Sequence, residues 1–271
     1  MEFQGHLTTQ CPHKDSQVSC QLEELAGLQM YSTKGQLKKA LRSLPRTLGG
    51  TYECILNCIP QHQWEYVFQV LKWLTFSKRC LICWELAAAL EVDVEGAAPV
   101  KGDNEVPVLQ AMLNMCSSLV TITPEHVDKD DVHVQLEHLS VQSYLTSEQI
   151  KLGKVKHFSF SAKSTHTLIS WTCLFVLLQL HNTESWESIA NLNSPLDLYS
   201  PNYWIQHVLS EDTASSTELE QPMRALFQLQ SMPYTNLIQL HDIDRPWNPP
   251  QLRCSLGTIP PLLYYVSCAG L

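Results

Sequence analysis

Glycine is scarce in this chain, at 10 of 271 residues, whereas leucine is plentiful and 44% of all residues are hydrophobic. That balance favours helices over a sheet-rich fold. The length allows one large domain or two small ones, with enough apolar residues for a buried core.

Positive charge is also sparse. Lysine and arginine number 18 against 27 acidic residues, which gives a net charge of −9, and they form no long cluster. Because binding to nucleic acid or to an anionic membrane depends on concentrated positive charge, neither is expected as a partner. The balance suits a protein with protein partners, or simply a solvated surface.

Long apolar runs are missing as well. The most apolar stretch, LISWTCLFVLLQL at 168–180, is shorter than the roughly 20 residues that a membrane-spanning helix requires, so we expect a buried helix there. The polar start MEFQGHLTTQCPHKDSQ lacks the apolar core of a signal peptide. We therefore expect a cytoplasmic protein whose ten cysteines are reduced and mostly buried.

Motifs of known catalytic sites are absent too. The sequence contains no phosphate-binding loop, no G-x-S-x-G nucleophile elbow and no H-E-x-x-H metal motif. The pair Asp242/Asp244 beside His241 fits loop capping better than acid–base chemistry. We expect no enzyme activity, no cofactor and no small-molecule substrate.

The pattern that is present is mainly helical. Val67, Val70, Leu71 and Leu74 share one face of a predicted helix within HQWEYVFQVLKWLTF. Further helices are predicted for QLEELAGLQ, QLKKALRSLP, TYECILNCIP, CWELAAALEV and the segment that starts near Pro107.

Two strands are predicted after these helices, over 119–123 and 132–137. Short helices followed by a hairpin give the outline of a winged helix, so the predicted fold class is mainly α with a small β-hairpin. An irregular helical region follows, with its strongest helix over 165–180, a shorter one starting after Pro201 and a third over 217–229. The proline-rich stretch 242–251 is predicted to be a loop or linker.

Six segments of the chain, taken in their order and spacing, carry a family resemblance. In LKKALRSLPRTLGGTYECIL the matching residues are Leu44, Pro45, Thr47, Leu48, Thr51 and Tyr52. The other matching segments are VLKWLTFSKRCLICWELAAAL, CSSLVTIT, VQLEHLSVQSYLTS, PLDLYSPNYWIQHV and PLLYYVSCAGL. Together they resemble fungal NACHT–ankyrin proteins, which are NLR-like signalling ATPases of the STAND class. The winged helix of these proteins carries the label of a GPI inositol-deacylase, but the missing nucleophile elbow gives no support for that activity.

The resemblance implies four parts. They are a disordered start (1–20), a helical linker plus winged helix (21–150), a helical region (151–240), and a linker with part of a first ankyrin repeat (241–271). The family's ATPase domain is expected before Gln21, and its phosphate-binding loop does not occur here. The resemblance therefore implies a non-catalytic regulatory module that couples a nucleotide domain to ankyrin repeats, from a truncated gene or an incomplete gene model.

The competing hypothesis is a free-standing interaction scaffold or an inert relic, with exposed apolar surface where the missing domains docked. Trp64, Trp73 and Trp204 are candidates for such a surface, although we expect core positions for all three.

His138 is the one candidate site residue. It follows the alternating strand 132–137 on its apolar face, which favours a buried core histidine where strand meets helix. By resemblance it stands at the position where STAND ATPases contact the β-phosphate of ADP, with Leu139 in place of the motif's acid. Ser140 is expected to cap the following helix, with Val141, Tyr144 and Leu145 facing inward. We expect a structural role here.

The sequence also allows two other kinds of site. The four cysteines of Cys54-x3-Cys58 and Cys80-x2-Cys83 allow a four-thiolate zinc site, but buried cysteines acting as small hydrophobes explain them better, so no metal is expected. DNA binding through the winged helix is disfavoured because its candidate recognition helix, 83–91, contains Glu85 and Glu91 and no Lys or Arg.

Overall fold

The computed structural model describes residues 47–92, 113, 118–124, 132–179, 195–210, 217–228, 232–246 and 261–271. The helices predicted before residue 47 lie outside this part. So does most of the helix predicted from Pro107, of which Leu113 is described as helical and buried.

The chain divides into two compact units, and the division does not follow chain order. Unit 1 comprises 1–60, 115–121 and 136–159, and unit 2 comprises 61–114, 122–135 and 160–271. Each unit therefore draws on distant stretches of the sequence.

Unit 1 is built on helices α3 (Leu48–Asn57), α7 (Leu139–Leu145) and α8 (Glu148–Leu152), followed by the 3-10 turn η2 (Lys156–Phe158). The Thr47 hydroxyl accepts a hydrogen bond from the Gly50 amide and so caps α3. The aromatic rings of Tyr52 and Tyr144 lie 5.6 Å apart in its core.

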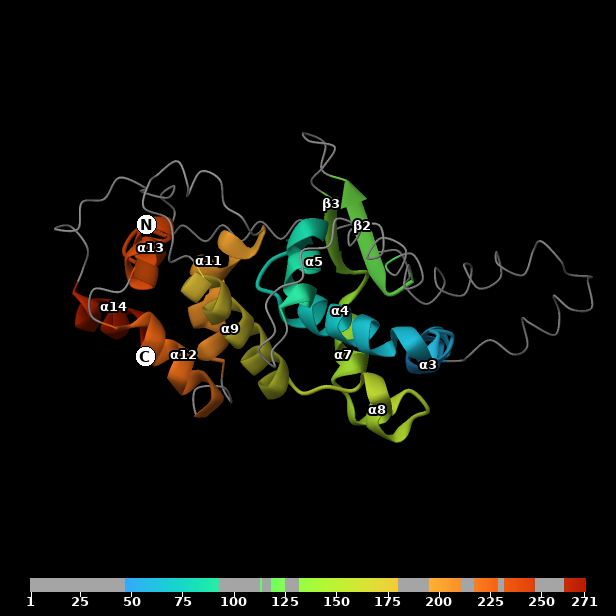
Figure 1. Ribbon diagram of the computed structural model, residues 1–271. Coiled ribbons are helices and arrows are strands. Elements are labelled where there is room, and N and C mark those ends of the chain that lie inside the picture. Colours follow the sequence, from blue (N-terminus) through green and yellow to red (C-terminus); the bar gives the residue numbers. More distant parts are fainter. Residues whose placement is uncertain are drawn as a thin grey trace, which may run out of the picture. The chain divides into compact units, whose positions relative to one another are not determined.

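Unit 2 contains helices α4 (Trp64–Phe76) and α5 (Cys83–Glu91), with the 3-10 turn η1 (Gln61–Gln63) before α4. Its central helix is α9 (Ala162–Gln179), which packs against α4 and against the later helices (Figure 1). The elements that follow α9 are η4 (Pro195–Asp197), α11 (Tyr199–Val208), η5 (Thr217–Leu219), α12 (Glu220–Leu226), α13 (Met232–Leu240) and α14 (Leu262–Ala269).

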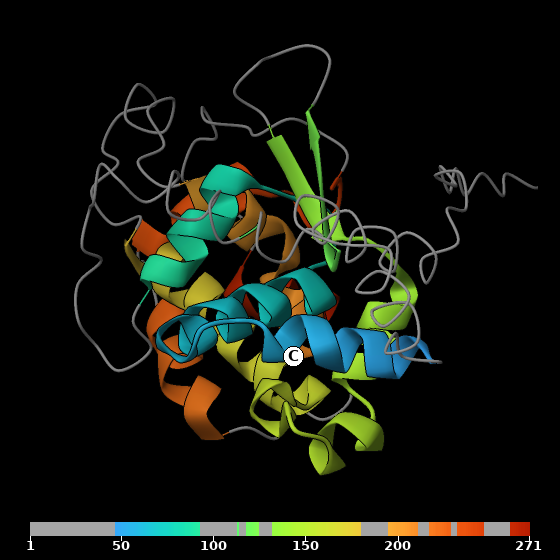
Figure 2. The ribbon, with the colours of Figure 1, turned by 90° about the vertical axis from the view of Figure 1, so that its right-hand side faces the viewer.

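A small antiparallel sheet completes the winged-helix pattern. Strands β2 (Val120–Pro124) and β3 (Val132–Leu136) lie side by side (Figure 2), and the sheet order is β1-β3-β2. The two-residue strand β1 (Leu81–Ile82) pairs Leu81 with Val134 and Ile82 with His133. The mainly α fold class with a small β-hairpin is confirmed, and β1 adds a third strand that was not predicted.

The predicted core of α4 is largely confirmed. Val67, Val70 and Leu71 are buried, whereas Leu74 is half-buried and Trp73 takes the deeper position. Trp73 and Trp204 are core residues, as expected, and Trp64 is half-buried.

The predicted start of one helix was wrong, and another helix was missed. Helix α11 begins at Tyr199 and includes Pro201, because a proline in the first turn forfeits only an amide that has no partner within the helix. Helix α13 was not predicted, although Leu237 and Ile238 form part of its buried face. Among the described helices, none is long and apolar enough to cross a membrane.

Candidate functional site: a buried histidine and tyrosine network

In the described part of unit 2, a group of buried polar side chains is joined by a continuous series of hydrogen bonds. The Nδ1 atoms of His166, on α9, and His207, on α11, are 2.9 Å apart. The hydroxyl of Tyr199, at the start of α11, lies 2.9 Å from Nε2 of His207 and accepts a hydrogen bond of 3.2 Å from the Lys78 amide. Three separate stretches of the chain therefore meet at these side chains.

The chemistry of the donors limits the protonation state of the rings. A hydrogen bond between two Nδ1 atoms requires that one ring donates and the other accepts. Either Tyr199 donates to His207, which then donates to His166, or the order is reversed along the chain. With both rings neutral, one acceptor nitrogen faces one N–H in either arrangement.

Burial and nearby charge keep these rings neutral. Burial and, to a smaller extent, the positive charge of Lys78 together lower the pKa of His166 to about 4. Burial, His166 and Lys78 together lower the pKa of His207 to about 3, and burial is the largest cause. The pKa of Tyr199 is raised, mainly by burial, so its hydroxyl stays protonated at neutral pH.

Aromatic rings surround the network. The ring of Phe76 lies 4.9 Å from that of His166, and the ring of Trp73 lies 6.0 Å edge-on from that of Tyr199. Both of these aromatic side chains belong to α4. The apolar shell excludes water, which strengthens each hydrogen bond inside it.

A partly buried ion pair extends the network toward the sheet. The Glu85 side chain is only 3% exposed and forms an ion pair with the two terminal guanidinium nitrogens of Arg79. Glu85 also accepts a hydrogen bond of 3.1 Å from the Ile82 amide at the start of α5. The guanidinium of Arg79 lies over the rings of Tyr199 and Tyr203, at 5.3 and 5.8 Å from their centroids. Strand β1 and helix α5 are thereby bound to α11.

The arrangement can orient and hold protons, but it presents no reactive group to a substrate. His166 is 8% exposed and His207 is fully buried. The nearby thiol of Cys173 is buried, and burial raises its pKa to about 12, so it is not a nucleophile at neutral pH. The chemistry supported here is the stabilisation of an interface.

His138, the predicted site residue, lies in unit 1 at the N-terminus of α7. Its Nδ1 accepts a hydrogen bond of 3.1 Å from the Ser140 amide and lies 2.7 Å from the Ser140 hydroxyl. His138 itself is therefore the N-cap, and the expectation that Ser140 caps the helix was wrong. Ser140 instead links His138 to Tyr52, whose hydroxyl lies 2.7 Å away.

The burial expected around His138 is only partly present. The side chain is half-buried rather than buried, because the strand ends at Leu136 and the chain has already left the sheet. Val141, Tyr144 and Leu145 do face inward.

The cysteines are more exposed than predicted. Cys58, Cys80 and Cys268 are exposed, Cys54 is half-buried, and Cys83 and Cys173 are buried. The exposed thiols lie at or near the ends of elements, where the chain turns away from the core. In the described part of the chain, no three His, Cys, Asp or Glu side chains are grouped so that they could hold a metal ion.

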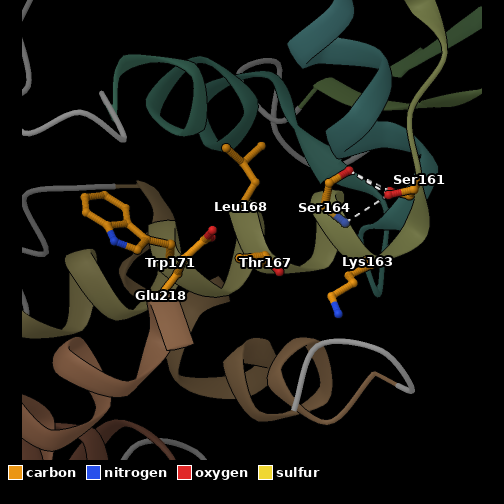
Figure 3. A pocket seen from close by; sticks show the side chains of 7 residues that line it. All are labelled: Ser161, Lys163, Ser164, Thr167, Leu168, Trp171 and Glu218. Carbon is orange, nitrogen blue, oxygen red and sulfur yellow. Dashed lines mark hydrogen bonds between the residues drawn. The ribbon is translucent and has the colours of Figure 1, made fainter. Parts of the chain in front are cut away.

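A pocket of about 340 Å³ opens on one side of α9 (Figure 3). Its walls are formed by Ser161, Lys163, Ser164, Thr167, Leu168, Trp171 and Glu218. The hydroxyls of Ser161 and Ser164 lie 2.9 Å apart, and the Ser164 amide donates to the Ser161 hydroxyl over 3.2 Å. These serines cap α9 and have no histidine beside them among the lining residues, so the pocket has no activated nucleophile.

Helix α5, the candidate recognition helix, exposes little of its surface. Trp84 is its one exposed residue, at 50%, and the rest of the helix is buried or half-buried, with η4 packed against it. The residues that lead from α5 to the hairpin, 93–117, lie outside the described part except for Leu113.

The acidic pair near His241 forms a turn. The Asp242 carboxylate accepts a hydrogen bond of 2.9 Å from the Asp244 amide, and Asp244 accepts one of 2.7 Å from the Tyr264 hydroxyl. Loop capping, as expected, accounts for both carboxylates.

Part of the network could have been predicted from the sequence. Tyr199, Tyr203 and His207 follow one another at intervals of four residues, which places them on one face of a helix. Their partner His166 is 41 residues away from His207, and no local pattern indicates that the two rings meet.

Comparison with known proteins agrees with the fold. Residues 63–159 match the model of the family described as GPI inositol-deacylase, winged helix domain. The chain is also similar to the "Azaphilone pigments biosynthesis cluster protein L" of Monascus ruber, with 28% identity over 214 residues. That similarity covers 78% of this chain and 45% of the relative, so the chain spans less than half of the relative's length. No solved structure matches the chain. The part that resembles a known domain is thus a winged helix, as the order of helices and strands predicts.

Proposed function

We propose that this chain is a non-catalytic regulatory module in which a winged helix is coupled to the helices that follow it. The observation that carries the proposal is a set of contacts in unit 2, the joint, which links the winged helix to α11. The turn after α4 and the start of α5 are bound to α11 through Lys78, Arg79 and Glu85. A displacement of α5 changes the contacts of Tyr199, and therefore reaches α9 through His207 and His166.

The wider context of the proposal comes from resemblance. The winged-helix match and the greater length of the relative support a role as the middle section of a longer protein of the NACHT–ankyrin type. In such a protein the winged helix passes the state of a nucleotide domain to a partner-binding array. His138 would then be the residue that faces the nucleotide domain. The binding partners of this chain would be other protein domains.

A second candidate function is a free-standing protein-interaction scaffold. The exposure of Trp84 and of Leu198, at 50% and 48%, favours it, because large apolar side chains in contact with water are common at protein interfaces. The two candidates differ in whether a change in the winged helix is transmitted through unit 2.

The test is a substitution within the joint, Glu85→Gln, in the full chain at neutral pH. Loss of the carboxylate leaves Arg79 without its buried partner. We expect amide hydrogen exchange to accelerate about tenfold or more in α11 as well as in α5, which corresponds to roughly 1.4 kcal/mol. The matched control is Glu65→Gln in α4, where an exposed carboxylate bonds only within its helix, to Gln69 over 2.8 Å.

Faster exchange confined to residues 79–91 would contradict the coupling and favour the scaffold.

A separate experiment tests the class of partner. A 20-base-pair DNA duplex and ADP should show no saturable binding to the protein at about 1 µM, a concentration at which even sequence-independent DNA binders begin to associate.

A further inference from the structure

We propose that the His166–His207 pair is an acid-sensitive latch that joins α9 to α11 while both rings are neutral and opens when the accepting ring takes up a proton. The inference rests on the proposed coupling, because it names what controls the joint. The two rings come from different helices and touch through a single hydrogen bond of 2.9 Å. Their protonation therefore decides whether the helices are bonded at this point.

The opening step is the addition of one solvent proton to a nitrogen lone pair. In the neutral pair, the N–H of one ring points at the Nδ1 lone pair of the other. A proton on that lone pair places two N–H groups face to face, with no acceptor between them. The hydrogen bond is lost, and a positive charge appears in a shell built by Phe76 and Trp73.

The charged neighbours oppose a protonated pair. Lys78 acts on both rings and disfavours a second positive charge, whereas Arg79 is neutralised by Glu85. Tyr199 stays neutral, as does Cys173 beside it. In the described part of the chain, the elements packed against α9 and α11, together with these two helices, carry ten other titratable groups, of which Glu220 and Arg224 are paired with each other. They are Glu65, Tyr66, Lys72, Lys163, Asp197, Tyr203, Glu218, Glu220, Arg224 and Tyr234.

The sign of the pH dependence follows from linkage. The folded-state pKa values of both histidines lie below the ordinary value of about 6.5, so the opened state binds more protons between that value and about 4. The latch is fully closed above pH 6.5 and weakens as the pH falls toward 4. At pH 5 the opened state is favoured by a further factor of about 30 per ring relative to neutral pH.

The first experiment follows the Lys78 amide, which donates to Tyr199 at the end of the network. Its protection factor, corrected for the intrinsic effect of pH on exchange, should fall at least about thirtyfold between pH 7 and pH 5. A fall of less than threefold would overturn the proposal. The control amide is that of Gly50, which is bonded to the Thr47 hydroxyl in unit 1 and should not follow this dependence.

A second measurement does not depend on variants that fold. In the unmodified chain, the imidazole carbon resonances of His166 and His207 should keep neutral shifts from pH 7 to pH 5. A midpoint above pH 6 for both rings would contradict the latch.

If the double variant His166→Gln/His207→Gln folds, its unfolding midpoint should change much less between pH 7 and pH 5 than that of the unmodified chain. The same replacement at the exposed His62 is the control.

The two proposals fail separately. The coupling test uses Glu85→Gln at constant neutral pH, whereas the latch test varies pH with Glu85 intact. Transmission at neutral pH without an acid response would leave the coupling standing and remove the latch.

Discussion

The hydroxyl of Tyr199 bonds two groups that come from different parts of unit 2. It accepts from the Lys78 amide and bonds Nε2 of His207. A backbone amide that is buried without an acceptor costs free energy comparable to a lost hydrogen bond. One oxygen atom therefore stabilises both the turn after α4 and the last turn of α11.

We predict that Tyr199→Phe lowers the free energy of unfolding of unit 2 by about 1–3 kcal/mol, because the ring stays packed while both partners lose their bond. Urea unfolding followed by tryptophan fluorescence measures the change, since Trp73 and Trp204 are both buried in unit 2. The control is Tyr203→Phe, which removes a hydroxyl from a half-buried ring 4.9 Å from that of Tyr199. Equal effects of the two substitutions would contradict the role given to the Tyr199 hydroxyl.

Side chains whose role is local were predictable from the sequence. Most inward positions of α4 and α7 follow from spacing alone, and so does the turn formed by Asp242 and Asp244. The contact between His166 and His207 was not predictable, because it depends on how two helices pack. The exposure of Cys58 and Cys80 was not predictable either, since cysteine's preference for burial does not show which thiols lie at the end of an element.

Helix α7 shows how one capping side chain fixes the start of an element. The helix has only seven residues and no acidic residue in its first turn. The hydrogen bond that His138 accepts from the Ser140 amide therefore supplies a large share of the stabilisation of its N-terminus. Tyr52 of α3 reaches the same serine, so the cap also joins α7 to α3.

We predict that His138→Ala lowers the free energy of unfolding of unit 1 by about 0.5–2 kcal/mol, and that His138→Asn loses much less because asparagine also caps helices. Thermal or urea unfolding followed by circular dichroism measures both variants. If the alanine variant is as stable as the unmodified chain, or the asparagine variant as unstable as alanine, the capping role is wrong. Added ADP should leave the unfolding midpoint of the isolated chain unchanged, since the proposed structural role needs no nucleotide.

At the element scale, the long and strongly patterned segments were predictable. Helix α9 was expected over 165–180 and runs from Ala162 to Gln179, and β3 begins at Val132 as expected. Strand β1 was not, because two residues carry no periodicity and its pairing with β3 is set by tertiary contact. Pro201 gave the wrong start for α11, because a proline is tolerated in the first turn of a helix and does not mark where the helix begins.

At the scale of the whole molecule, chain order and packing differ. The winged-helix match ends at residue 159, yet α4 and α5 share a compact unit with α9, η4 and α11 from the following region. The mainly α fold class was predictable from composition and helical spacing. The grouping of elements was not, because it depends on bonds such as Lys78 to Tyr199 across 121 residues.

The proposed coupling requires that the winged-helix elements of unit 2 and the later helices form one cooperative structure. Native-state hydrogen exchange of the full chain at neutral pH measures this cooperativity. We predict that the slowest amides of α4 and α5 open with the same free energy as those of α9 and α11, and that denaturant lowers both sets in parallel. If the amides in residues 64–91 open at a distinctly lower free energy than those in residues 162–208, the two regions unfold independently and the coupling is contradicted.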